Sequence, residues 1–108
     1  MSAPSERADV CHVDVSGLAP GQTRAVEAEG IKLLVCNVDG AFFVIENRCP
    51  HAMVTLDQGT LRGCVLECPV HGGTLDVRDG SPQSHPIRRS AQTFSVREVG
   101  TTLEVSLS

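Results

Sequence analysis

Two short motifs, each with one cysteine and one histidine, constrain this 108-residue chain more than any other feature. The first reads Cys49-Pro50-His51 and the second reads Cys68-Pro69-Val70-His71. Each motif places a thiolate and an imidazole on a single loop, and the sixteen residues between the motifs are enough for a turn and a returning strand. Two loops at one end of a sheet can therefore hold a metal between them, with two sulfur and two nitrogen ligands.

Two kinds of metal centre use two cysteines and two histidines. Structural zinc binds them in tetrahedral geometry, but its usual arrangement pairs cysteine with cysteine and histidine with histidine along the chain. A two-iron, two-sulfur cluster with two cysteines on one iron and two histidines on the other suits loops that carry one ligand of each type, because each loop then reaches both irons. The mixed loops here favour the cluster, and zinc stays as an alternative.

The pattern C-x-H, sixteen residues, C-x₂-H closely resembles the Rieske signature. Gly59 and Gly63, the His71-Gly72-Gly73 segment and Pro86 after Asp79-Gly80 also resemble the Rieske ferredoxins that serve bacterial ring-hydroxylating dioxygenases. The resemblance in order and spacing runs from residue 31 to 107. It implies one cluster per chain, with Cys49 and Cys68 on the inner iron, His51 and His71 on the outer iron, and a covering loop at 80–90.

The resemblance also implies a function. It predicts a one-electron carrier that takes electrons from a flavin-containing, NAD(P)H-dependent reductase and passes them to a terminal oxygenase in aromatic hydrocarbon catabolism. A catalytic role of its own is not expected, because a mononuclear oxygenase iron needs two further histidines and a carboxylate, and only His12 and His85 remain. The alternatives are the small Rieske-like subunit of an assimilatory nitrite reductase and a structural zinc-binding module.

Turn signals recur every ten to twenty residues and predict an all-β chain, because the segments between them are rich in β-branched and apolar residues. The Asp39-Gly40 pair predicts a two-residue hairpin. No segment shows sustained helical periodicity. Strands are expected at residues 10–13, 23–28, 31–38, 41–45, 64–67, 75–77, 93–99 and 102–107.

The Rieske resemblance sharpens this expectation to a fold. It implies three layered antiparallel sheets in a single domain over residues 1–108. A small cluster-binding part at 46–77 would be inserted into a basal part formed by the rest of the chain.

Two departures distinguish this chain from a related group, and the second of them predicts a low reduction potential. Rieske proteins of respiratory complexes carry a disulfide between the cluster loops, where this chain has Val54 and Val70. They also place a serine and a tyrosine hydroxyl near the cluster, where this chain has Gly73 and no tyrosine at all. Hydroxyl donors stabilise the reduced cluster, so their absence predicts a potential towards the low end of the Rieske range.

Composition limits the classes of partner that the chain can bind and the compartment in which we expect it. A net charge of −4 lacks the excess of cations that nucleic acid requires, and no apolar stretch is long enough to span a membrane or to form a secretory signal. A cytoplasmic monomer is expected. Cys11, Cys36 and Cys64 are then free structural thiols. Some surface arginines are docking candidates, although scattered charges usually serve solubility; these are Arg48, Arg62, Arg88 and Arg89.

Overall fold

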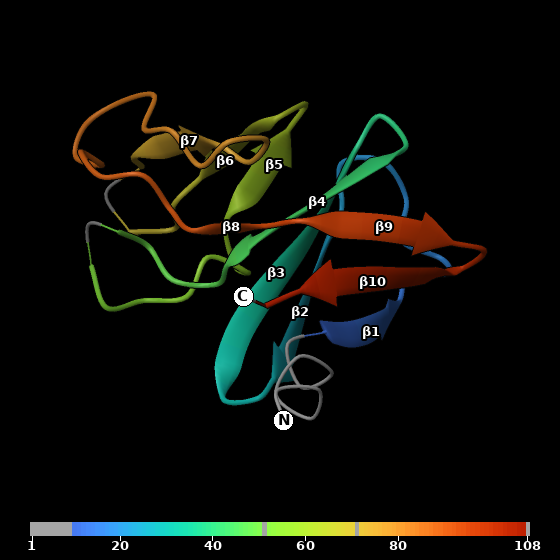
Figure 1. Cartoon of the computed structure of the whole chain (residues 1–108). Coiled ribbons are helices and arrows are strands. Elements are labelled where there is room, and N and C mark those ends of the chain that lie inside the picture. The colour runs from blue at the N-terminus through green and yellow to red at the C-terminus, as the bar shows by residue number, and fades with distance from the viewer. Residues whose placement is uncertain (1–9, 51, 71, 108) are drawn as a thin grey trace.

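The computed structural model describes residues 10–50, 52–70 and 72–107. Within these ranges the chain forms ten strands and no helix (Figure 1). The strands are β1 (Val10–Asp14), β2 (Thr23–Ala28), β3 (Ile31–Val38), β4 (Ala41–Glu46), β5 (Thr60–Arg62), β6 (Val65–Glu67), β7 (Thr74–Asp76), β8 (Thr93–Phe94), β9 (Val96–Val99) and β10 (Thr102–Ser106). Consequently, nothing in the described part is a helix long and apolar enough to cross a membrane.

The chain forms three antiparallel sheets, as the Rieske resemblance implies, and β3 belongs to the four-stranded one. Their strand orders are β1-β10-β9, β2-β3-β4-β8 and β5-β6-β7. Successive side chains of a strand point to opposite faces, so Leu33 and Val35 of β3 join the core shared with β10, while Leu34 and Cys36 join the core shared with β5, β6 and β7. All four side chains are fully buried. The middle sheet is therefore covered on both faces.

The hairpin predicted at Asp39-Gly40 is confirmed. Val38 pairs with Ala41, and the two residues between them have φ of 52° and 95°. Positive φ at both central positions is the mark of a type I′ turn, which matches the right-handed twist of the flanking strands. The long strands β3 and β4 are thereby held in register up to the start of the first cysteine loop.

The predicted strand at 93–99 is wrong as a single element. Phe94 of β8 pairs with Val44 in the middle sheet, whereas β9 pairs with β10 in another sheet. Ser95 lies between them, and its carbonyl accepts a hydrogen bond from Ser106 N at 2.9 Å. The alternation of apolar residues continues through such a switch, so periodicity alone does not show it.

Two smaller differences concern the small sheet. Strand β5 was not expected, because its three residues hold a single buried side chain, Leu61, which is too short for a periodic signal. Cys64 lies in the turn between β5 and β6 and not in the strand predicted at 64–67, since Arg62 pairs directly with Val65.

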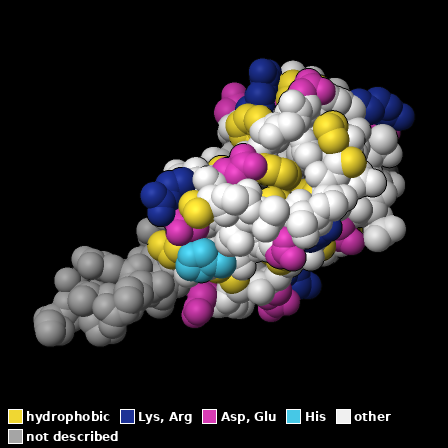
Figure 2. Space-filling view, turned by 90° about the vertical axis from the view of Figure 1, so that its right-hand side faces the viewer, with side chains coloured by type: hydrophobic (Ala, Val, Ile, Leu, Met, Phe, Trp, Pro, Cys, Tyr) yellow, Lys and Arg dark blue, Asp and Glu magenta, His cyan; other side chains and the backbone are white. Residues whose placement is uncertain are grey.

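The small sheet and both cysteine loops lie at one end of the molecule, on the left of Figure 1, and the loop 80–90 arches beside them. The opposite end, viewed in Figure 2, carries acidic, basic and hydrophobic side chains interspersed with one another.

Candidate metal centre

Each of the two cysteine loops is closed by a backbone hydrogen bond of the same kind. Cys49 N donates to Val54 O at 2.8 Å, and Cys68 N donates to Gly73 O at 2.7 Å. Each cysteine therefore begins a tight loop that returns to its own backbone five residues later. The first loop follows β4 and the second follows β6, so the ends of two different sheets position the two cysteines.

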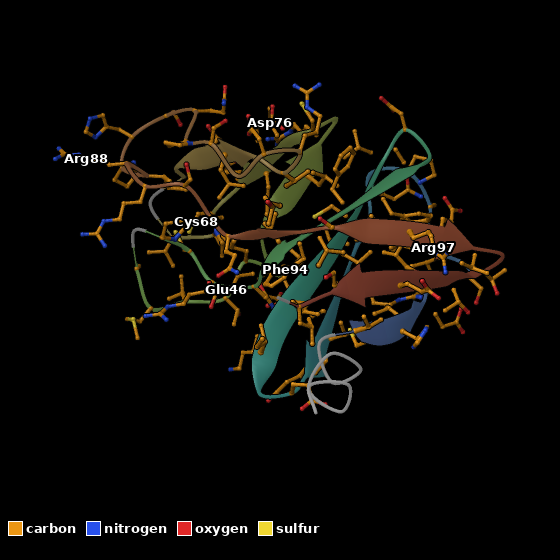
Figure 3. The ribbon with its side chains drawn as sticks, in the orientation of Figure 1. Glu46, Cys68, Asp76, Arg88, Phe94 and Arg97 are labelled. Carbon is orange, nitrogen blue, oxygen red and sulfur yellow. The ribbon has the colours of Figure 1, made fainter. Side chains whose placement is uncertain are left out.

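The structure brings Cys49 and Cys68 together. Both residues are buried, with 1% of the surface of each exposed. Burial raises the pKa of the Cys68 thiol, the adjacent Cys49 thiol raises it further, and the backbone N–H of Val70 opposes the rise. Two sulfur atoms thus face each other in an apolar setting, at the end of the molecule where Figure 3 labels Cys68. The other two predicted ligands, His51 and His71, lie outside the described residues.

This pair of sulfurs fits the thiolate half of a two-iron, two-sulfur cluster. Thiolates are the soft ligands that iron–sulfur clusters use, and both cysteines are free thiols that can supply them. The described residues alone form no group of three or more metal-binding side chains.

A buried asparagine holds the first cysteine loop in place. The sequence did not predict this role. Asn47 lies between β4 and Cys49, and its Oδ1 accepts a hydrogen bond from Leu56 N at 2.7 Å. Its Nδ2 donates to Asp57 Oδ1 at 3.2 Å. Hydrogen bonds from Thr55, Gln58 and Asn47 lower the pKa of Asp57, so this carboxylate stays charged and keeps accepting them. One side chain thus ties both ends of the segment that carries Cys49.

Valine side chains stand where related proteins carry a disulfide. Val54 and Val70 are partly buried and pack against the core that also contains Cys49 and Cys68. Apolar packing therefore joins the two loops to the same core in place of a covalent link.

The loop 80–90 is fixed at its base and lies on the second cysteine loop. Gly80 and Ala91 close its base through a hydrogen bond from Ala91 N to Gly80 O at 2.8 Å. Thr74 Oγ1 and Ser84 Oγ lie 2.7 Å apart, and Ile87 is buried in the same core as Cys68. A Cβ at Gly73 would come within 2.8 Å of Ile87 Cγ1, so the two loops touch with no space between them.

The other three cysteines have separate surroundings. Cys36 is fully buried in β3, and burial raises the pKa of its thiol to about 12. The Cys64 Sγ atom lies 3.7 Å from Asp76 Oδ2, and Cys11 lies half-buried in β1. The structural roles of these three cysteines stay a prediction.

The fold and the paired thiols agree with what a comparison with known families shows. A family model described as the Rieske [2Fe-2S] domain matches residues 8–95. This chain belongs to the Rieske [2Fe-2S] domain family. The prediction from the Cys-x-His and Cys-x₂-His motifs is therefore confirmed at the level of the family.

Curated relatives of this Rieske chain are ferredoxin components. Ferredoxin CarAc of Metapseudomonas resinovorans is 39% identical over 82 residues, which cover 75% of this chain and 77% of the relative. The ferredoxin component of biphenyl 2,3-dioxygenase from Rhodococcus jostii (strain RHA1) is 37% identical over 90 residues, covering 83% of this chain and 84% of the relative.

Two of the solved structures similar to this chain also come from dioxygenase systems. The ferredoxin of carbazole 1,9a-dioxygenase from Nocardioides aromaticivorans IC177 superposes with a TM-score of 0.84 and 30% identity, covering 89% of this chain and 94% of that chain. A chain from the complex of reduced oxygenase and oxidized ferredoxin in carbazole 1,9a-dioxygenase gives a TM-score of 0.88 and 33% identity, covering 94% and 95%. The Rieske fold predicted for the chain is confirmed. The chain is a Rieske electron carrier of the ferredoxin type and not a catalytic enzyme.

Proposed function

We propose that this chain carries single electrons from a flavin-containing, NAD(P)H-dependent reductase to the terminal oxygenase of an aromatic-ring dioxygenase system. The observation that carries the proposal is the buried pair of Cys49 and Cys68 thiols at one end of a Rieske fold. Relatives named as ferredoxin components of biphenyl and naphthalene dioxygenase systems support it, and so does a solved complex of a related ferredoxin with its oxygenase.

We propose Cys49, His51, Cys68 and His71 as the four ligands of one cluster per chain. Such a cluster supplies a one-electron couple when bound. The chain's own residues set its surroundings: burial of both sulfurs keeps water away from them, and the Val70 N–H lies where it can hydrogen-bond to the Cys68 sulfur. A donor to a ligand sulfur stabilises negative charge there and so favours reduction.

The domain organisation follows from the same proposal. Residues 46–77 hold both cysteine loops and the sheet β5-β6-β7, and we assign the cluster-binding part to them. The rest of a single domain over 1–108 forms the basal part. We propose a monomer that acts in the cytoplasm, where a reducing environment suits a protein whose five cysteines are all free thiols.

The test is electron transfer through the purified holoprotein. The protein is mixed anaerobically with NADH and the reductase component of a biphenyl or carbazole dioxygenase system, and visible absorbance follows its reduction. Addition of the oxidised oxygenase component of the same system should then reoxidise it. A protein that stays oxidised with the reductase and instead co-purifies with a sirohaem protein would contradict the proposal and indicate a nitrite reductase subunit.

A further inference from the structure

Half of the eight described cations are already paired with acceptors of this chain. Arg62 lies 3.0 Å from Glu67, Arg78 lies 2.8 Å from Asp76, and Arg97 lies 2.9 Å from Glu104. Arg24 donates to the backbone carbonyls of Asp14 and Ser16. A carboxylate of this chain thus compensates the charge of Arg62, Arg78 and Arg97, and backbone acceptors occupy the guanidinium of Arg24.

The four remaining cations make no ion pair with another described residue. They are Lys32, Arg48, Arg88 and Arg89, and all four are exposed. Arg48 and Arg89 line one groove of about 450 Å³, and Cys49 and Pro50 line the same groove. Arg88 precedes Arg89 in the loop 80–90 and points away from the body of the molecule at the cysteine end (Figure 3).

A second groove joins this surface to Lys32. It has a volume of about 340 Å³, and it shares Glu46, Arg48 and Met53 with the first groove. The Arg48 guanidinium lies 2.7 Å from the Met53 sulfur, so these two side chains form the ridge between the grooves. We call Lys32, Arg48, Met53, Arg88 and Arg89 the cationic face.

Met53 makes this face suited to a protein partner. With 81% of its surface exposed, it is the most exposed large hydrophobic residue in the part of the chain that the structure describes. Protein interfaces place apolar side chains, methionine among them, inside a rim of polar residues, and arginine is enriched in them. An exposed methionine among unpaired cations has this composition.

The sign of the face is opposite to that of the whole chain. The net charge is −4, so an unspecific electrostatic preference would bring a cationic partner to this protein. Among the residues that the structure describes, Glu46 is the one carboxylate that lines the two grooves. Because Cys49 lines the first groove, a protein bound there lies beside the metal centre.

We propose that the cationic face docks a protein that presents carboxylates around its own electron-transfer centre. This inference rests on the proposed function and adds the chemistry of the partner surface. Complementary charge steers the encounter and fixes the orientation in which the cluster end meets the partner.

Voltammetry of the holoprotein tests this with a surface of known chemistry. The electron-transfer rate is measured at gold electrodes coated with carboxylate-terminated or amine-terminated alkanethiols. The carboxylate surface should give the faster rate, on the order of tenfold, and added salt should remove the difference. A faster rate at the amine surface, or equal rates, overturns the proposal.

A pair of variants with equal net charge provides the control. Arg88→Gln with Arg89→Gln should lose the preference for the carboxylate surface, whereas Arg62→Gln with Arg97→Gln should keep it. The two control arginines are also exposed, with 73% and 74% of their side-chain surface accessible. Arg62 lies at the turn end of the small sheet, and Arg97 lies at the opposite end of the molecule (Figure 3). Equal behaviour of the two double variants contradicts the inference.

Two further measurements separate the possible failures. On a carboxymethyl column at low ionic strength and at a pH below the isoelectric point of the chain, which is about 5.4, Arg88→Gln/Arg89→Gln should elute before Arg62→Gln/Arg97→Gln. This comparison needs no electron transfer, and co-elution of two retained variants overturns the docking inference. Absence of any Rieske redox signal contradicts the proposed function instead. A third experiment sediments the protein with phosphatidylserine vesicles. If the protein binds the vesicles and the Arg88→Gln/Arg89→Gln variant does not, the cationic face binds a membrane and not a protein, and the proposal is overturned.

Discussion

Gly73 and Ile87 pack so closely that a Cβ added at Gly73 would lie 2.8 Å from Ile87 Cγ1 and 2.9 Å from Pro86 Cδ. This contact joins the second cysteine loop to the loop 80–90. It also means that the position where respiratory Rieske proteins carry a hydroxyl has no room for any side chain. The expected low reduction potential and the close packing of the covering loop therefore have a common cause.

Gly73→Ala should destabilise the protein by about 1–3 kcal/mol, the usual cost of overpacking a closed contact. Thermal unfolding of Gly73→Ala, Ile87→Ala and the double variant measures this. Because Ile87→Ala removes part of the obstruction, the double variant should be less destabilised than the sum of the single variants. Strictly additive effects would show that the two loops do not press on each other.

Asn47 should matter for the metal centre as well as for stability. Asn47→Ala removes an acceptor for Leu56 N–H and a donor to Asp57, and the cost of leaving a buried amide unpaired is about 1–3 kcal/mol. The first cysteine loop loses its brace, so iron should also be lost faster when a chelator is added. Thermal unfolding and iron release report the two effects.

Asn37 offers a matched control for this prediction. It is as buried as Asn47, with 4% exposed, and it also makes two hydrogen bonds, to Leu18 O and from Gly40 N. Asn37→Ala should lower stability by a similar amount and leave the rate of iron release unchanged. Equal iron release from both variants would mean that Asn47 supports only the fold.

The sequence predicted the fold best where a local rule determines the structure. The Asp39-Gly40 turn needs positive φ at two positions, and the strand predicted at 102–107 is found as β10, which buries Leu103 and Val105 on one face. Both are properties of neighbouring residues, and both are confirmed.

Non-local relations were not predictable in this way. The switch at Ser95 depends on which strand is adjacent in space, and the brace at Asn47 depends on a loop ten residues further along. At the metal centre, the motif spacing predicted that Cys49 and Cys68 come together. It carried no information on Ile87, whose side chain, together with Pro86, leaves no space for a Cβ at residue 73.

Cys36 should make the protein less stable at alkaline pH. Burial raises the pKa of its thiol from 9.0 to about 12, so between these values the folded chain holds a proton that the unfolded chain has lost. Its contribution to stability is complete below pH 9 and declines as the pH rises towards 12, by at most about 1.4 kcal/mol per pH unit. Chemical denaturation across this range measures the slope.

Cys36→Ser provides the comparison, because a serine hydroxyl does not titrate in this range. The variant should lack this part of the alkaline decline and should keep its full iron content, since we assign Cys36 a structural role. A folded variant without iron would show that this assignment is wrong.

His51→Cys tests the assignment of the histidine ligands. Replacing a neutral imidazole by a thiolate adds negative charge to the cluster and makes its reduction harder, so the potential should fall by on the order of a hundred millivolts. Voltammetry of the reconstituted variant gives the value. An unchanged potential in a variant that still holds a cluster would remove His51 from the ligand set.

The most direct test of the central claim is the low-temperature electron paramagnetic resonance spectrum of the anaerobically purified protein, recorded before and after dithionite, with metal analysis of the same sample. A cluster held by two cysteines and two histidines predicts about two irons per chain and a signal, present only after reduction, whose average g lies below that of all-cysteine clusters. A colourless, folded protein with one zinc per chain would contradict the account.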